Sequence, residues 1–356
     1  MRCFALDHNG KRCSRNVENK FPPLCSTHRG EIPMSFTERK MYREQEVKNS
    51  NDLDSKALAK QATEQALAEA EVRLGLNQRA PVSDIIQECR IVLGFNTYFT
   101  VLKTLGTGTF GKVFSARVTP KGKTLNYAMP EIVAVKEMSF NPEARLHLEL
   151  LKNELRILKE INVPHSVKYY GCYIESDKIY IIMELVNGEE LLNVLHKVKL
   201  TQREKLILCQ NIAQGINEIH RLNIAHRDLK FQNIMVDINT FKIKLIDFGL
   251  ACNLAEMSFG CNVPSGSPAF MDPHVELLDI NSMKLADWWA FGQMLVIMFT
   301  YNFLYTPEGY YRGITGAELN KFPAALRDII VKLTDPKIKQ NARPRPDEII
   351  ASLNKK

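Results

Sequence analysis

The sequence His226-Arg-Asp-Leu-Lys-Phe-Gln-Asn233, with Asp247-Phe-Gly249 shortly after it, decides the fold of this chain. Two further motifs come earlier, Gly106-Thr-Gly-Thr-Phe-Gly-Lys-Val113 and Val133-Ala-Val-Lys136. A glycine-rich run alone is a weak signal, because glycines also form ordinary hairpin turns. Four motifs in this order and at these separations would very rarely occur together by chance. We therefore interpret them as parts of one site.

The ordered set resembles the eukaryotic-type serine/threonine protein kinase family. The resemblance implies an α+β, two-lobed fold with a β-rich first lobe and a helical second lobe. It also implies transfer of the γ-phosphate of ATP to serine or threonine hydroxyls of protein substrates. Local patterns agree with this layout. They predict strands at 99–105, 112–118 and 179–185, a helix at 145–161, and another helix opened by the capping box Thr201-x-x-Glu204.

The length and composition fit one catalytic domain with a smaller addition. The chain has 356 residues, with hydrophobic and charged fractions of 45% and 24% and a formal charge of +7. These are ordinary values for a globular protein. We expect a Cys/His module at residues 1–34, a polar helix-forming linker at 35–97, and the kinase catalytic domain at 98–354.

The sequence gives no sign of a membrane span or of secretion. The longest strongly apolar run, Trp288 to Phe299, falls short of the roughly 20 residues that a span needs. The N-terminus carries charged residues early and no apolar run. Eight cysteines in a chain of this length do not indicate a disulfide scaffold. We therefore expect an intracellular, cytoplasmic protein that does not bind membranes and has reduced cysteines.

Lys136 resembles the strand lysine that contacts the α- and β-phosphates of ATP in this family. A buried cation at that place needs an acidic partner. Glu154 is the preferred partner, and Glu149 on the same predicted helix is the alternative. The family's lysine–glutamate ion pair marks its active state.

The catalytic roles follow from the same resemblance. Asp228 would accept the proton of the attacking hydroxyl and orient it, and Lys230 would steady the γ-phosphate as a point charge. Asn233 and Asp247 would supply oxygen ligands for Mg²⁺. A lysine two residues after the catalytic aspartate is similar to serine/threonine kinases. Ser267 keeps a hydroxyl that would bridge Asp228 and Lys230.

The resemblance also places the nucleotide. Leu105, Val113 and Ala134 would form the roof of the adenine pocket and Met235 its floor, with Met183 as the gatekeeper. The full set of expected nucleotide-binding residues is Leu105, Gly106, Gly108, Gly111, Val113, Ala134, Lys136, Met183, Glu184, Leu185, Met235, Asn233 and Asp247. Glu184 and Leu185 would belong to the hinge. The alternative is that the apolar members belong to a generic core, which uses the same residue types.

One segment departs from the family pattern. Asp272-Pro-His274 stands where the family has Ala-Pro-Glu, and Arg343 matches the buried arginine that pairs with that glutamate. His274 cannot form this ion pair, and an unpaired buried guanidinium is costly. Either Asp272 takes the role of the glutamate or Arg343 turns outward.

The control of activity is left open by the sequence. Arg227 occupies the position that often pairs with a phosphorylated activation loop in this family. Ser258, Ser265 and Ser267 are the candidate acceptors. The alternative is a short loop that is ordered without phosphate.

The N-terminal module contains Cys3, Cys13, Cys25 and His28. Thiolates and imidazole suit tetrahedral Zn²⁺, and such a site can hold together a segment too small for its own core. The alternative is a set of unpaired thiols in a loose arm. The pattern is similar to small modules in proteins of large DNA viruses, which would place the protein in the cytoplasm of a host cell or in a virion. Nearby basic residues would tolerate nucleic acid, but a solvated face is the preferred interpretation.

Two other classes of function remain as alternatives. A pseudokinase scaffold would bind nucleotide without transfer. Loss of one of the polar site residues would have favoured it, but all five are present: Lys136, Glu154, Asp228, Asn233 and Asp247. An adaptor would act through the cysteine module. A metabolic small-molecule kinase is less favoured, because residues 266–273 resemble a peptide-docking platform. The sequence does not indicate the oligomeric state or the substrate protein.

Overall fold

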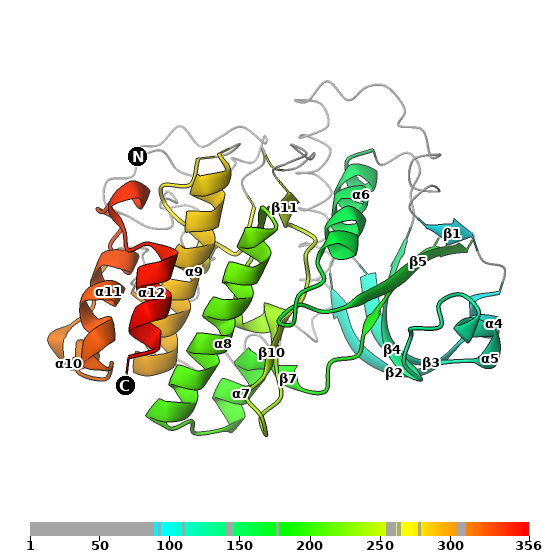
Figure 1. Cartoon of the computed structure of the whole chain (residues 1–356), viewed down its shortest axis with the longest axis horizontal. Coiled ribbons are helices and arrows are strands. Elements are labelled where there is room, and N and C mark those ends of the chain that lie inside the picture. The colour runs from blue at the N-terminus through cyan, green and yellow to red at the C-terminus, as the bar shows by residue number, and fades with distance from the viewer. Residues whose placement is uncertain are drawn as a thin grey trace, which may run out of the picture. The chain divides into compact units, whose positions relative to one another are not determined.

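The computed structural model describes residues 89–91, 94–108, 111–139, 145–175, 178–253, 261, 265–276, 279–304 and 311–355. The expected cysteine module and the linker up to residue 88 lie outside the described residues. The described part of the chain divides into two compact units, with the boundary between Asn187 and Gly188. Sheet structure dominates the first unit and helices dominate the second, as the sequence predicts (Figure 1).

The first unit is built on a six-stranded sheet with the order β1-β5-β6-β4-β3-β2. The strands are β1 (Arg90–Ile91), β2 (Phe99–Gly108), β3 (Gly111–Val118), β4 (Ile132–Ser139), β5 (Tyr169–Glu175) and β6 (Lys178–Glu184). The predicted hairpin around the glycine motif is confirmed, because β2 and β3 pair antiparallel up to Gly108 and Gly111. The central strands carry β-branched residues such as Ile179, Ile181 and Val135, which are fully buried.

The main helix of this unit, α6 (Arg145–Glu160), confirms the helix predicted at 145–161. Its buried leucines are Leu148, Leu151, Leu155 and Leu158. This spacing of three and four residues puts them on one stripe of the helix, which is the face a helix buries against a core. Glu154 lies beside this stripe and is also buried.

Residues 89–91 and 94–97, which the sequence assigned to the linker, pack against the sheet. β1 pairs in parallel with β5, and Cys89 forms a disulfide with Cys172 of β5. In α4 (Phe95–Tyr98), the buried Phe95 ring stacks on Tyr180 with 4.0 Å between ring centroids. The packed unit therefore begins before residue 98.

The second unit is mainly helical, with two small sheets. Its helices are α7 (Leu191–Lys197), α8 (Gln202–Arg221), α9 (Ile280–Thr300), α10 (Gly316–Leu319), α11 (Ala324–Thr334) and α12 (Pro346–Leu353). α8 starts with the predicted capping box, since Thr201 and Glu204 exchange both hydrogen bonds. The sheets have the order β10-β9-β7 and β11-β8. Their strands are β7 (Glu189–Glu190), β8 (Ile224–Ala225), β9 (Ile234–Val236), β10 (Ile243–Leu245) and β11 (Cys252–Asn253).

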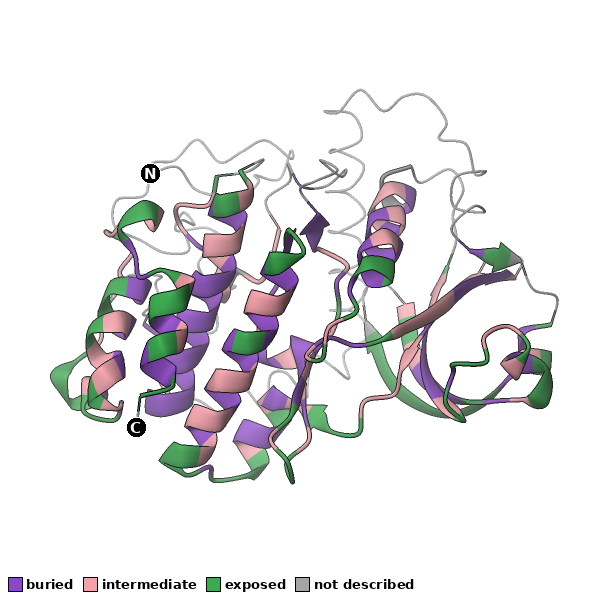
Figure 2. Cartoon of the chain, viewed as in Figure 1, coloured by how far each residue is buried: buried purple, intermediate pink, exposed green. Residues whose placement is uncertain are grey.

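α9 forms the core of this unit, with α8 and α11 packed against it (Figure 1). It is buried on every side from Asp287 to Thr300 (Figure 2). A helix that is apolar all round is expected to lie in a core. Among the described helices, none combines the length and apolarity that crossing a bilayer requires.

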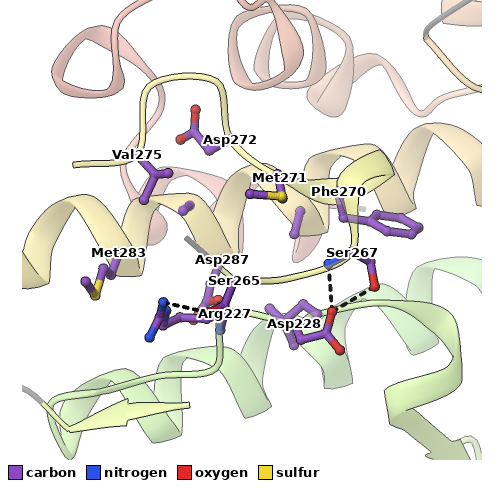
Figure 3. Close-up of a pocket in the computed structure, with 13 residues that line it drawn as sticks. Arg227, Asp228, Ser265, Ser267, Phe270, Met271, Asp272, Val275, Met283 and Asp287 are labelled. Carbon is purple, nitrogen blue, oxygen red and sulfur yellow. Dashed lines mark hydrogen bonds between the residues drawn. The ribbon is translucent and has the colours of Figure 1, made fainter. Parts of the chain in front are cut away.

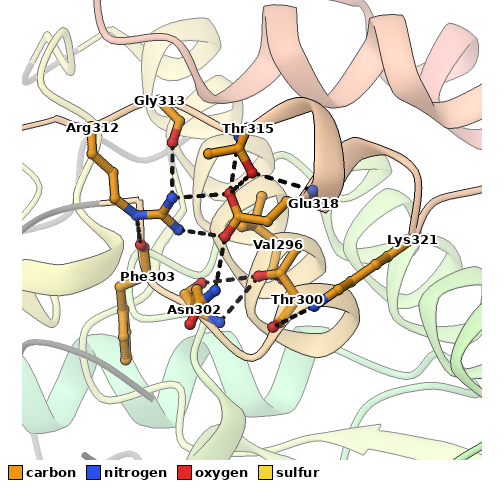
Figure 4. Close-up of polar contacts among 9 residues, drawn as sticks. All are labelled: Val296, Thr300, Asn302, Phe303, Arg312, Gly313, Thr315, Glu318 and Lys321. Atoms are coloured by element: carbon orange, nitrogen blue, oxygen red, sulfur yellow. Dashed lines mark hydrogen bonds and ion pairs between the residues drawn. The ribbon is translucent and has the colours of Figure 1, made fainter. Parts of the chain in front are cut away.

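A buried carboxylate organises the segment after α9. Glu318 accepts two hydrogen bonds from the guanidinium of Arg312, at 2.9 and 2.8 Å, and one from the side-chain amide of Asn302 at 2.8 Å (Figure 4). It also caps α10 together with Thr315. Burial alone raises the pKa of Glu318, but the hydrogen bonds from Arg312, Thr315 and Asn302 outweigh it and lower the pKa from 4.5 to about 2.

The cysteines differ from the expectation of reduced thiols. Cys89 pairs with Cys172, and Cys252 pairs with Cys261, while Cys209 is a buried free cysteine whose thiol pKa is raised by burial. The expectation is therefore wrong for these four residues. Cys89 and Cys172 are separated by 83 positions in sequence. Only the pairing of β1 with β5 brings them together, so the sequence alone could not reveal the link.

Candidate active site

The two expected Mg²⁺ ligands are placed by one hairpin. β9 and β10 pair antiparallel, with Ile234 opposite Leu245. Asn233 immediately precedes β9, and the carbonyl oxygen of Asn233 accepts a hydrogen bond from the Ile246 amide at 3.0 Å. Asp247 comes next, with an exposed side chain and a left-handed φ of 61°. The hairpin therefore presents Asn233 and Asp247 from the same end, and the strained backbone at Asp247 is typical of a functional position.

Asp228 is the centre of a polar cluster. One carboxylate oxygen, Oδ1, accepts hydrogen bonds from the Ser267 amide at 2.9 Å and the Ser267 hydroxyl at 2.8 Å (Figure 3). The other oxygen, Oδ2, lies 2.7 Å from Nζ of Lys230 and accepts from Nδ2 of Asn233 at 3.0 Å. Lys230 also donates to the Ser267 hydroxyl at 3.1 Å. The expected bridge of Ser267 between Asp228 and Lys230 is thus present.

The amide group of Asn233 is oriented by these contacts. Its nitrogen donates both to the Asp228 carbonyl oxygen at 2.9 Å and to the Asp228 carboxylate. Because the nitrogen is used in this way, the amide oxygen is the atom that can bind a cation. Asn233 and the exposed carboxylate of Asp247 therefore form a donor set that fits a hard divalent cation.

Asp287 on α9 holds the backbone at the start of residues 226–233, which we call the catalytic loop. Its carboxylate, which is almost fully buried, accepts hydrogen bonds from the amides of His226 at 2.7 Å and Arg227 at 2.8 Å. The ring of His220 also lies 2.8 Å from it. These bonds stabilise a left-handed φ of 65° at Arg227, which a non-glycine residue adopts only when the surroundings enforce it. Sequence reasoning did not identify the contacts that Asp287 makes, because they join residues about 60 positions apart.

Arg227 is held inside the second unit. Burial lowers the pKa of its guanidinium to about 10, while the charge of Asp287 acts in the opposite direction. The side chain therefore stays charged at neutral pH. One of its nitrogens donates to the Ser265 hydroxyl at 3.2 Å (Figure 3). Ser265 belongs to residues 247–274, which we call the activation segment. This serine thus occupies a site that resembles a phosphate-binding position.

The activation segment approaches the catalytic loop closely at Gly266. Its φ is 119°, and a Cβ atom there would lie 2.5 Å from the carbonyl oxygen of Arg227. Only glycine fits such a position. Residues 265–275 and α9 enclose a pocket beside Asp228 (Figure 3). Its apolar side chains include Phe270, Met271 and Val275.

Asp272 resolves the departure from the family pattern. Its carboxylate accepts hydrogen bonds from both terminal nitrogens of Arg343, at 2.6 and 3.1 Å, and from Gln340 at 2.6 Å. Both members of the ion pair are buried. Of the two possibilities raised by the sequence, Asp272 takes the place of the missing glutamate and Arg343 stays inside. His274 instead bonds through its ring to the carbonyl oxygen of Pro336 at 2.7 Å.

The first unit contains the expected lysine–glutamate ion pair. Nζ of Lys136 lies 2.6 Å from Oε1 of Glu154, and both side chains are largely buried. Lys136 is fixed by its place in β4, where it pairs with Val113 on β3 and Ile181 on β6. Because α6 presents Glu154 from its buried face, strand and helix together set the distance between the two charges. Glu154, rather than the alternative Glu149, is the partner.

The expected nucleotide-binding residues of the first unit lie on adjacent strands. Ala134 on β4 pairs with Met183 on β6, and Val113 pairs with Lys136. Leu105 is exposed on β2, while Glu184 ends β6 and Leu185 follows it. Met235 lies on β9 of the second unit, and its position is described only within that unit.

The glycine motif has two different structural requirements. Gly111 has φ 142°, and a Cβ atom there would lie 2.0 Å from the carbonyl oxygen of Glu137, so this glycine is needed for the approach of β3 to β4. A Cβ atom on Gly106 would meet nothing within 4 Å. Gly106 therefore borders open space next to the backbone, which is what close approach of a phosphate requires. Gly108 ends β2.

Other predictions concern residues outside the described part of the chain. These are the zinc ligands Cys3, Cys13, Cys25 and His28, and the candidate phosphoacceptor Ser258. Within the part of the chain that the structure describes, no group of three or more His, Cys, Asp or Glu side chains is arranged to hold a metal ion. Sequence reasoning missed the support that Gln340 gives to Asp272 and the link between Cys252 and Cys261, because neither has a local sequence signal.

Comparison with known proteins agrees with this geometry. Residues 99–349 match the family model of the protein kinase domain. The chain is 31% identical over 202 residues to serine/threonine-protein kinase shk2 of Schizosaccharomyces pombe, covering 56% of this chain and 33% of that protein. It is 31% identical over 249 residues to CBL-interacting serine/threonine-protein kinase 24 of Arabidopsis thaliana, covering 67% of this chain and 53% of that protein.

A third relative is the probable serine/threonine-protein kinase mkcD of Dictyostelium discoideum, which is 35% identical over 198 residues, or 55% of this chain and 29% of that protein. The chain thus spans only 29% to 53% of the length of these three relatives. The domain match, in contrast, covers well over half of the chain and includes every motif from the glycine loop to Arg343. On this evidence, the chain belongs to the protein kinase family.

Proposed function

We propose that this protein transfers the γ-phosphate of ATP to serine or threonine hydroxyls of protein substrates. The observation that carries the proposal is the cluster of Asp228, Lys230, Asn233 and Ser267, in which every polar contact needed to position the carboxylate is formed. The names of the matched relatives, all serine/threonine kinases, support the choice of acceptor residue. The lysine at position 230 supports it as well.

Asp228 acts on the substrate hydroxyl. A carboxylate has about four lone-pair sites, and Ser267, Lys230 and Asn233 occupy them in this structure. Lys230 is the exchangeable partner, because its side chain is partly exposed and carries a flexible stem. When Lys230 turns to the γ-phosphate, Oδ2 of Asp228 becomes able to accept the hydroxyl proton. The hydroxyl oxygen then forms a bond to phosphorus, and the bond to the ADP oxygen breaks.

The remaining residues hold the nucleotide and its cation. Lys136, which forms an ion pair with Glu154, contacts the α- and β-phosphates, and the backbone around Gly106 covers them. The oxygens of Asn233 and Asp247 would bind Mg²⁺. When bound, this ion neutralises the charge that develops on the phosphate oxygens. The apolar side chains Val113, Ala134, Met183 and Met235 contact the adenine ring.

The test is transfer of radiolabelled γ-phosphate from MgATP to a mixed protein substrate, followed by phosphoamino-acid analysis. We expect label on serine or threonine with the wild type and none with Asp228→Asn. The pseudokinase alternative predicts that a folded protein binds nucleotide but transfers no label. Label on tyrosine alone would contradict the proposed residue class.

The N-terminal module is a separate proposal. We propose that Cys3, Cys13, Cys25 and His28 bind one Zn²⁺, since thiolate and imidazole are the ligands that zinc prefers. Metal analysis of the full chain should find zinc that is lost in Cys25→Ser/His28→Ala. Absence of zinc from the wild type would contradict it. Deleting residues 1–34 tests the adaptor alternative: loss of partner binding with unchanged phosphate transfer would support it.

The cellular location is likewise a proposal. We propose that the protein acts in the cytoplasm, of a host cell if its source is viral. Fluorescence imaging of the tagged full chain should show a cytoplasmic signal. A signal confined to the secretory pathway would contradict it.

A further inference from the structure

We propose that Cys252 and Cys261 form a reversible thiol–disulfide site, and that their oxidation by a low-molecular-weight disulfide such as oxidised glutathione holds the activation segment against the catalytic loop. The inference rests on the proposed kinase function for its effect on activity. It concerns a site that phosphate transfer itself does not use.

The two cysteines join the activation segment to β11, which pairs with β8, the strand that enters the catalytic loop. Their Cα atoms are 5.6 Å apart, and nine positions separate them in sequence. Cys252 lies in β11 directly opposite Ala225 of β8, which is followed at once by His226. Both cysteines are fully buried and pack with Ala225 and Met283. The link therefore fixes Cys261 to the base of the catalytic loop.

The position of Cys261 affects the residues that contact Asp228. Shortly after Cys261, the Ser265 hydroxyl accepts a hydrogen bond from Arg227, and Ser267 donates two to Asp228. Between these serines, Gly266 lies so near the Arg227 carbonyl oxygen that a Cβ atom there would be 2.5 Å from it. Because so few residues separate Cys261 from these contacts, release of Cys261 frees the segment that carries them.

The contacts of Ser267 favour a covalent link over phosphate at that residue as the holding device. A phosphate on Ser267 would place negative charge against the Asp228 carboxylate, to which its hydroxyl now donates. The Ser265 hydroxyl is already the oxygen that Arg227 contacts. The segment is thus ordered around unmodified serines, and the disulfide is the covalent constraint nearest to them.

The exchange is balanced in atoms and electrons. The thiolate of one cysteine attacks a sulfur of oxidised glutathione, forms a mixed disulfide, and releases one glutathione thiolate. The thiolate of the second cysteine then attacks the protein-side sulfur and releases the second glutathione. The protein pair loses two electrons, the glutathione disulfide gains them, and the two protons pass to the released thiolates.

The test uses the full chain in glutathione buffers of different oxidised-to-reduced ratio. Differential alkylation with mass spectrometry reports whether Cys252 and Cys261 are linked, and phosphate-transfer kinetics are measured in the same buffers. We expect kcat over KM for the protein substrate to fall about tenfold or more on reduction, since small misplacements near reacting groups have effects up to about 10²-fold. KM for ATP should stay unchanged.

Two variants separate this disulfide from the other one. Cys89→Ala/Cys172→Ala removes the link in the first unit and should keep the full response to reduction. Cys252→Ala/Cys261→Ala should have low activity in every buffer and no response. Wild-type protein in the reduced buffer also lacks the link between Cys252 and Cys261. It therefore tests the same loss of activity without a substitution near the catalytic loop. Equal activity of the wild type in both buffers, or free thiols at both positions under oxidised glutathione, would overturn the proposal.

Hydrogen exchange distinguishes failure of this proposal from failure of the kinase function. The backbone amides of residues 265–272 should exchange faster after reduction of Cys89→Ala/Cys172→Ala. If the protein transfers no phosphate in any buffer, the kinase proposal fails, and hydrogen exchange alone tests the redox site. Faster exchange on reduction then supports the redox site, and unchanged exchange overturns it.

Discussion

Asp228 in the catalytic loop and Asp272 at the end of the activation segment are both buried carboxylates in the second unit, but their partners differ. Asp228 is surrounded by a hydroxyl, two amides and a lysine that is about one quarter exposed. Asp272 is closed by the guanidinium of Arg343, which is itself 1% exposed and lies over the ring of Trp289. The partners of Asp228 can exchange with a substrate, while those of Asp272 cannot.

This difference explains why one motif follows the family pattern and the other departs from it. Asp228 must lie near Asn233, Lys230 and the arriving hydroxyl, so its place in the chain is fixed by the chemistry. Arg343 needs only a carboxylate within reach, and Asp272 meets that need from a different position in the turn. The amide of His274 even donates to Asp272 at 2.9 Å, so the replaced position now supports the replacement.

Asp228→Asn should have the largest effect. Loss of the carboxylate removes the acceptor of the hydroxyl proton, and a positioned acid or base contributes about 10²- to 10⁴-fold in rate. We expect a fall of that size in kcat, measured with saturating MgATP. Thermal unfolding should shift little, because an amide can still accept from Ser267. Substantial remaining turnover would show that another group does this work.

Asp272→Ala should mainly affect stability. Removing one partner of a buried ion pair costs about 3–5 kcal/mol, because the other charge stays buried without compensation. Urea unfolding of the two proteins measures this difference. Asp347→Ala is the matched control, since its ion pair with Arg345 is exposed and such pairs contribute about 1 kcal/mol or less. Equal costs for both substitutions would contradict the assignment.

Moving the carboxylate back to the family's position sharpens the comparison. In Asp272→Ala/His274→Glu, the new glutamate should reach Arg343 and restore about 1–3 kcal/mol, the range for satisfying a buried polar group. Recovery should be incomplete, because the ring of His274 loses its bond to Pro336. Urea unfolding again provides the measurement. If the double variant is no more stable than Asp272→Ala alone, the pairing depends on position and not only on reach.

Glu318 provides a smaller, pH-dependent test of a third buried carboxylate. Its pKa in the folded protein, about 2, lies below the ordinary value of 4.5. Its contribution to the free energy of unfolding is therefore complete above pH 4.5 and is lost as the pH falls towards about 2. The stability difference between wild type and Glu318→Gln, measured by urea unfolding, should shrink over that range. A difference that is constant with pH would contradict the low pKa.

The sequence predicted those parts that local pattern or chemistry determines. Lys136 and Glu154 were paired correctly, because a buried lysine requires an acid and the family resemblance placed one on the helix that follows. The hairpin at Gly106–Val113 and the capping box at Thr201 are local signals and were also predicted. Two alternatives for Arg343 stayed open, since the choice depends on the three-dimensional path of residues 272–274.

Other features depend on tertiary proximity and had no signal in the sequence. Cys89 meets Cys172 only because β1 adds to the edge of the sheet beside β5. Arg312 and Asn302 meet Glu318 only after the chain turns at the end of α9. The left-handed backbone at Arg227 is imposed by Asp287, which lies about 60 positions away.

The most direct measurement is to determine turnover and the free energy of unfolding together for Asp228→Asn and Asp272→Ala. Both are compared with the wild type at a temperature where all three are folded. The account predicts that Asp228→Asn is about as stable as the wild type but almost inactive, and that Asp272→Ala transfers phosphate while unfolding at much lower urea. An active Asp228→Asn, or a fully stable Asp272→Ala, would contradict the division between a reacting and a structural carboxylate.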